Sequence, residues 1–117
     1  MPRYMLILHD AMPVLAQMSP ADMQAIVERY TAWGQKLGAS GQMVGGEKLK
    51  DEGGKRLSKA QGAMVVRDGP YAEAKEVIGG FYMIAAANYD EAVALCRDCP
   101  HLDLGGQIEL REVDEMS

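Results

Sequence analysis

The amino-acid sequence predicts an α+β fold in a single domain that covers residues 1–117. Three observations lead to this prediction. The chain has the length of one ordinary domain. Its apolar patterns follow the order β-α-β, a β-rich middle, and β-α-β again. Its charged fraction of 25% and hydrophobic fraction of 48% are those of a globular protein, which excludes a disordered or collagen-like chain.

The first part of the chain predicts a strand followed by a helix. Residues Arg3–Leu8 form a short apolar run with an aromatic side chain, typical of a buried strand. A helix is expected after Ser19, because serine caps helices, Pro20 suits the first turn and Asp22 occupies the position of a capping-box acid. The helix ends near Gly38. Its expected buried stripe has spacings of three, four and seven: Met23, Ile26, Val27, Tyr30, Gly34 and Leu37.

The middle of the chain predicts short strands separated by turns. Gln42–Leu49 is a weak strand, and the glycine pair Gly45-Gly46 within it indicates a bulge or a close approach of two backbones. Turn residues at 51–54 precede a short return strand at Lys55–Lys59. Ala63–Arg67 is expected to be another strand. These strands exceed what a simple sandwich requires, so we expect an extra β-hairpin.

The last part of the chain predicts a strand, a helix and a closing strand. Phe81–Ala87 is continuously apolar, as in a strand buried on both faces. Asn88 and Glu91 form a capping pair at the start of the helix, which Pro100 ends. Gln107–Val113 alternates between apolar and polar residues, as a half-buried strand does. The expected buried stripe of the helix consists of Tyr89, Ala92, Val93, Cys96 and Cys99.

This order of elements predicts a ferredoxin-like sandwich with an extra β-hairpin. Two helices can cover only one face of the sheet. The strands Arg3–Leu8 and Phe81–Ala87 are nevertheless apolar on both faces. A second copy of the same surface, placed across a two-fold axis, would cover the other face. The sequence therefore predicts a homodimer.

Charge and composition exclude several classes of partner. The net charge of −5 argues against nucleic acid, since phosphate contacts require a basic surface. No apolar run approaches the length of about 20 residues that spans a membrane. The apolar core at Tyr4–Leu8 is too short for a secretion signal. Two cysteines without such a signal predict free thiols in the reducing cytoplasm.

The segment Arg67–Tyr82 contains Asp-Gly-Pro-Tyr, then Glu-Ala-Lys-Glu, then Gly-Gly. It resembles the DGPF domain of the YCII-related family, with Tyr71 in place of the motif's phenylalanine. The resemblance continues at Arg3–Leu8, Val44–Glu47, Cys99–His101 and Gly105–Arg111, so it covers essentially the whole chain. It implies a ferredoxin-like fold that dimerises into an α+β barrel. It also implies a bacterial protein with a possible association with extracytoplasmic-function sigma factors, because some members are encoded near them.

The Asp-Gly-Pro segment offers candidate ligand-binding residues: Asp68, Gly69, Pro70, Glu73 and Lys75. Asp68 can form an Asx-turn, and the proline and glycine shape the chain around it. The charges that follow would then line the polar mouth of a cavity. The alternative is a well-capped loop whose charges are simply solvated.

His9 is the candidate catalytic base, because it ends the first strand and histidine exchanges protons near neutral pH. Its expected partner is Asp68 or Glu47, with Arg111 or Lys75 as an anchor for an anion. Some YCII-related proteins outside the DGPF group are thought to pair an aspartate with a histidine that follows a proline at the start of the first helix. Here Pro20-Ala21 leads to Asp22, so that pair is absent.

The closing strand predicts a polar lining on the face without helices. Ile108 and Leu110 share one side of this strand and should point toward the helices. Glu109 and Arg111 should then point to the opposite face, where a dimer would enclose them. Burying these charges is costly unless they pair, meet water or meet a ligand. We therefore expect both residues to take part in ligand binding.

The sequence predicts no metal and no cofactor. Cys96 and Cys99 have C-x-x-C spacing, but they end a helix, where the dipole disfavours a thiolate. His101 could be a third zinc ligand, yet no second pair completes a tetrahedral site. The paired glycines lack the lysine of a phosphate loop and the GxGxxG spacing.

Two functions remain open at this point. One is a dimeric, non-catalytic protein that binds a small ligand or regulates a component of the transcription machinery. The other is a cofactor-independent lyase, isomerase or dehydrochlorinase that acts on a small organic substrate. The absence of the family's histidine favours the first. A buried His9 within hydrogen-bond distance of a carboxylate in a closed cavity would favour the second.

Overall fold

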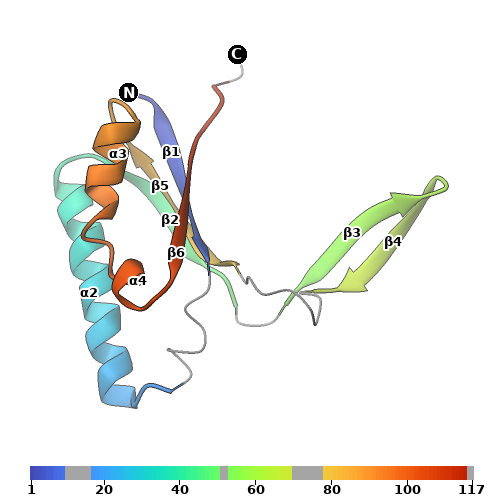
Figure 1. Ribbon diagram of the computed structural model, residues 1–117, viewed down its shortest axis with the longest axis horizontal. Coiled ribbons are helices and arrows are strands. Elements are labelled where there is room, and N and C mark those ends of the chain that lie inside the picture. The colour runs from blue at the N-terminus through green and yellow to red at the C-terminus, as the bar shows by residue number, and fades with distance from the viewer. Residues whose placement is uncertain (10–16, 51–52, 70–77, 116–117) are drawn as a thin grey trace.

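Four antiparallel strands form the main sheet of the computed structural model, which describes residues 1–9, 17–50, 53–69 and 78–115. Their order is β2 (Met43–Lys48), β5 (Ile78–Ala85), β1 (Arg3–His9) and β6 (Gln107–Glu112). The helices α2 (Pro20–Ala39), α3 (Tyr89–Cys96) and α4 (Pro100–Asp103) lie on one side of this sheet (Figure 1). A separate hairpin consists of β3 (Lys55–Ala60) and β4 (Ala63–Asp68). The predicted ferredoxin-like α+β fold with an extra hairpin is confirmed.

The core lies between the helices and the sheet. In β1 the side chains of Tyr4, Leu6 and Leu8 are buried, and the residues between them are half-buried on the other face. Ile84 of β5 joins this core from the neighbouring strand. Because side chains alternate between the two faces of a strand, one face of the sheet packs against the helices. The other face, called the open face below, carries none of the described helices.

Helix α2 begins as predicted, since the Ser19 hydroxyl accepts a hydrogen bond of 3.1 Å from the backbone N–H of Asp22. The predicted stripe was wrong at two positions. Val27 is 55% exposed, whereas Trp33 is buried and donates from its indole nitrogen to the Leu95 carbonyl oxygen at 3.1 Å. The buried side chains are Ile26, Trp33 and Leu37. Spacings of seven and four keep them on one line, and Val27 is rotated about 100° away from it.

Helix α3 is capped as predicted, because the Asn88 side chain accepts a 2.9 Å hydrogen bond from the Glu91 backbone. Its predicted stripe was too wide. Tyr89 and Val93 are each 46% exposed, and the small residues Ala92 and Cys96 face the core. Tyr89 instead stands edge-on against Tyr4, with ring centroids 4.9 Å apart. The expectation that Pro100 ends the helix was wrong: α3 ends at Cys96, and Pro100 begins the short helix α4, which the sequence did not predict.

The backbones of β2 and β5 approach closely, as the glycine pair in β2 predicted. A Cβ atom on Gly46 would lie 2.8 Å from the Phe81 carbonyl oxygen, and one on Gly80 would lie 2.7 Å from that of Glu47. The pairing also shifts register between Met43 and Gly45. Side chains are excluded here because the strands occupy the space that a Cβ atom would need.

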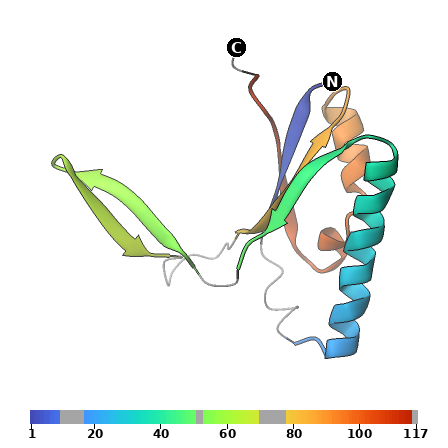
Figure 2. The same ribbon diagram turned by 180° about the vertical axis from the view of Figure 1, so that it is seen from behind.

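The β3–β4 hairpin, residues 55–68, is called the arm below. Its strands pair from Lys55 opposite Asp68 to Ala60 opposite Ala63. Gln61 and Gly62 connect them with φ angles of 53° and 81°, as in a two-residue turn that matches strand twist. The arm extends from the side of the sheet opposite the helices, as both views show (Figures 1 and 2). Within the described residues, no helix is long and apolar enough to cross a membrane.

Candidate functional site

The open face combines an apolar centre with charged residues on β6. Ile7 lies between Phe81 and Glu109, and Met5 lies between Met83 and Arg111. The apolar side chains of these rows are half-buried within the single chain. The expectation that β5 is buried on both faces is therefore not met in the single chain, because none of the described helices covers this side (Figure 2).

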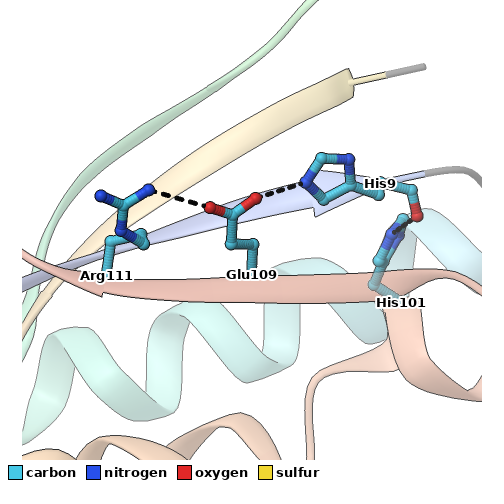
Figure 3. Close-up of polar contacts among 4 residues, drawn as sticks. All are labelled: His9, His101, Glu109 and Arg111. Carbon is cyan, nitrogen blue, oxygen red and sulfur yellow. Dashed lines mark hydrogen bonds and ion pairs between the residues drawn. The ribbon is translucent and has the colours of Figure 1, made fainter. Parts of the chain in front are cut away.

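Three polar side chains on this face form a continuous row of contacts (Figure 3). His9 Nε2 lies 3.0 Å from Glu109 Oε1, and Arg111 donates to the other carboxylate oxygen of Glu109 at 3.1 Å. The alternation predicted for the closing strand places Glu109 and Arg111 here, since Ile108 and Leu110 pack toward the core. The side chain of His9 is 14% exposed, that of Glu109 43% and that of Arg111 69%. The row therefore runs from the protein interior to solvent.

The two hydrogen bonds favour the ionised form of Glu109. The bond from Arg111, followed by that from His9, lowers the pKa of the Glu109 carboxyl below its ordinary value. Glu109 is thus ionised at neutral pH and accepts a hydrogen bond from His9 Nε2–H. A carboxylate in this position fixes the tautomer and the orientation of an imidazole ring.

A second histidine supports the end of β1 from the core side. The buried His101 donates from Nε2 to the backbone carbonyl oxygen of His9 at 2.8 Å, because a carbonyl oxygen can only accept (Figure 3). In the neutral ring, Nδ1 then accepts a hydrogen bond from the Tyr30 hydroxyl at 3.2 Å. A Cβ atom on Gly106 would lie 2.3 Å from His101 Nε2, so the ring occupies the space that this glycine leaves. His101 thus connects the start of α4 to the backbone of the candidate base.

Sequence reasoning missed this role of His101. It considered the residue only as a zinc ligand, because its spacing from Cys96 and Cys99 suggested one. The available signal was the glycine at 106, five residues after His101, where a turn can bring the backbone against the ring.

The two carboxylates expected to pair with His9 lie on other strands. Asp68 ends β4 at the base of the arm, where its carboxylate is 86% exposed and pairs with Lys55. Glu47 is exposed on β2, opposite Phe81. Glu109 thus occupies the position of carboxylate partner that the sequence argument gave to Asp68 or Glu47.

The Asp-Gly-Pro segment is described only at its start. Gly69 packs tightly, since its N–H donates to the Gly54 carbonyl oxygen at 3.1 Å and a Cβ atom would lie 2.9 Å from the Gly53 carbonyl oxygen. Pro70, Glu73 and Lys75 lie outside the described residues. The cavity mouth assigned to this segment therefore stays a prediction.

The two cysteines are free and buried. Burial raises the pKa of the Cys96 thiol to about 11 and also raises that of Cys99. The thiols are therefore protonated at neutral pH, which makes them poor nucleophiles and poor metal ligands. Within the part of the chain that the structure describes, no group of three or more His, Cys, Asp or Glu side chains could hold a metal ion.

The amino-acid sequence is similar to that of a known protein family and to a known bacterial protein. The sequence pattern of the YCII-related domain matches residues 3–117. The chain belongs to the YCII-related family. It is also 36% identical, over 77 residues, to an uncharacterized protein of Rhizobium meliloti (strain 1021). That match covers 66% of this chain and 57% of the relative, so the chain spans little more than half of the relative's length. Membership in the YCII-related family confirms the resemblance seen in the sequence.

Proposed function

We propose that this YCII-related protein is a homodimer that binds a small organic anion on the open face. The observation that carries the proposal is the row His9–Glu109–Arg111 beside an apolar sheet surface. A second copy packed on this face would bury its half-exposed apolar residues. It would also enclose the charged row, and a site of this kind is mostly apolar with a few fixed polar groups.

The exposed end of the row gives the ligand its chemical class. One nitrogen of the Arg111 guanidinium contacts Glu109, and the side chain remains 69% exposed. Guanidinium presents paired donors that match a carboxylate or phosphate group. The neighbouring Met5 and Met83 would contact the apolar part of the ligand. A small organic acid fits both properties.

Binding of benzoate, with neutral benzamide as its isostere, tests this proposal by calorimetry. We expect Arg111→Gln to weaken benzoate binding by about 10-fold or more and to leave benzamide unaffected, since a lost charge-assisted bond costs about 1.5–3 kcal/mol. Arg97→Gln, at an exposed arginine after α3, is the matched control. Sedimentation reports the dimer in parallel. Equal benzoate affinity in both variants would contradict the proposal.

A second candidate function rests on the contact between His9 and Glu109. A largely buried imidazole held by an ionised carboxylate is the arrangement of a general base. It supports a cofactor-independent lyase, isomerase or dehydrochlorinase. Elimination of chloride or water from a panel of small β-chloro and β-hydroxy acids would reveal this activity. His9→Gln should then lower the rate about 100-fold or more, whereas Glu28→Gln on α2 should not.

We include two further points in this proposal: a regulatory association with a sigma factor and a location in the cytoplasm. An association with an extracytoplasmic-function sigma factor follows from the family resemblance, and a cytoplasmic location fits two free, buried thiols. Co-purification with the sigma factor encoded nearest in the source genome tests the first. Recovery of the tagged protein in the periplasmic fraction would contradict the second.

A further inference from the structure

We infer that the arm clasps the second copy of this chain in the dimer. The inference rests on the proposed function, which supplies the dimer, but it concerns a different surface. Its starting point is that the arm is a two-stranded sheet with no described element packed on it. Every residue of β3 is exposed, and an isolated two-stranded hairpin is at best marginally stable in water.

One face of the arm carries an apolar strip, flanked on the same face by Lys55, Lys59 and Asp68. Residues directly opposite each other in an antiparallel pair share a face, so Leu57, Val66 and Met64 lie together. They are 63%, 51% and 63% exposed. Three large apolar side chains in one strip at this exposure indicate a contact surface rather than scattered surface residues.

The charge of the arm favours a second copy of this chain as the partner of this surface. The arm carries four basic side chains (Lys55, Arg56, Lys59 and Arg67) and one carboxylate, Asp68, for a net charge of +3. The whole chain carries −5, so the residues outside the arm carry −8. The residues outside the arm, 1–54 and 69–117, are called the body below. A basic arm is complementary in charge to the acidic body of an identical chain.

The direction of the arm agrees with this occupant. The arm leaves the sheet on the side of the open face and diverges from it, so that the sheet and the arm resemble the two sides of a V (Figures 1 and 2). A second copy seated on the open face would lie within that V. Two-fold symmetry would then place each arm along the body of the other copy.

A photo-cross-link tests the contact directly. Met64 of the full chain is replaced by p-benzoylphenylalanine, and preparations labelled with ¹⁴N and ¹⁵N are mixed before irradiation. We expect mass spectrometry to find links that join differently labelled chains and that reach residues outside the arm. The same replacement at Val27, which is exposed on α2, is the control and should give no such links.

Sedimentation tests the energetic role of the arm. We expect Leu57→Ser with Val66→Ser to raise the dimer dissociation constant about 10-fold or more, because two apolar contacts are lost. Val27→Ser with Val93→Ser, at 55% and 46% exposure on the helices, is the matched control and should leave it unchanged. Circular dichroism confirms that each variant retains its helices.

The possible outcomes separate this inference from the proposed function. A monomeric wild-type chain would overturn both. A dimer with unchanged dissociation constant and links only within one chain would overturn the clasp alone. Loss of binding to a 20-base-pair DNA duplex in Lys59→Glu, with the dimer unaffected, would assign the basic arm to nucleic acid and would also overturn it.

Discussion

The strands β1 and β3 have similar lengths and antiparallel neighbours, yet only one of them builds a core. In β1 every second side chain is buried, because helices cover one face of the sheet. In β3 every residue is exposed, although its backbone is paired along the whole strand. Backbone pairing therefore determines the shape of both strands, whereas burial against another layer provides most of the stability. The comparison shows that the described arm has backbone pairing but no buried side chains on β3.

Two candidate carboxylates from the sequence, Asp68 and Glu109, differ in the same way as these strands: Asp68 is largely exposed, and Glu109 is held by neighbouring side chains. Asp68 forms one exposed ion pair with Lys55 on the arm, a type of contact that contributes about 0–1 kcal/mol. Glu109 is held by two donors, one of which is largely buried. A fixed carboxylate next to a histidine can orient a reacting or binding group, so the body rather than the arm holds the better-defined site.

The largest difference is expected between Leu6→Ala in β1 and Leu57→Ala in β3. Leu6 is fully buried, so its truncation leaves a cavity and should lower the free energy of unfolding by about 2–5 kcal/mol. Leu57 is exposed, and its truncation should change this free energy by less than about 0.5 kcal/mol in dilute protein. Urea denaturation measures both values. Equal losses would show that the arm is part of the same core.

Gly106→Ala sharpens the comparison within the body. Its new Cβ atom would displace the His101 ring, so we expect a loss of about 1–3 kcal/mol in the free energy of unfolding. Gly79→Ala in β5 is the control, because nothing lies within 4 Å of its Cβ position. Thermal denaturation compares them. In a ligand-binding protein of the proposed kind, Gly106→Ala should also weaken benzoate binding, since His101 holds the backbone of His9.

Ser19→Ala tests how far the start of α2 supports the core. The lost hydrogen bond to the Asp22 N–H should cost about 1 kcal/mol in the free energy of unfolding. Ser58→Ala on the exposed arm is the matched serine and should have almost no effect. Chemical denaturation of both variants provides the measurement, and a larger loss at Ser58 would contradict the contrast between body and arm.

The smallest expected effect is the pH dependence of the site. Arg111 and His9 lower the pKa of Glu109 in the folded protein. A carboxyl whose pKa is lowered on folding contributes stability above its ordinary pKa of about 4.3 and loses that contribution as the pH falls through the folded value. Wild type should therefore lose stability relative to Glu109→Gln when denaturation is repeated at decreasing pH below about 4.3. Parallel curves would show that the row contributes nothing to stability.

The sequence was sufficient for features that depend on near neighbours. The caps at Ser19 and Asn88, the close approach at Gly46 and the turn-bounded strands of the arm could all be inferred, because each follows from residues within a few positions. The side of the closing strand that carries Glu109 and Arg111 could also be inferred, since alternation has a period of two. Helix faces were less certain: Val27 lies about 100° from the buried line of Ile26, Trp33 and Leu37, and only packing against the sheet decided which side was buried.

By itself the sequence determined the order of the α+β elements other than the short helix α4, and it determined which charged residues lie on the open face, because these features depend on local periodicity and on residue type. Only the tertiary structure decided which groups meet. Pairing of β1 with β6 brings His9 Nε2 to 3.0 Å from Oε1 of Glu109, a residue 100 positions away. Asp68 lies instead in the arm, a separate two-stranded sheet. The fold likewise places His101 under the end of β1, where Gly106 leaves room for its ring. Contacts of this kind depend on strand order and register, which are set by the packing of the whole sheet against its helices.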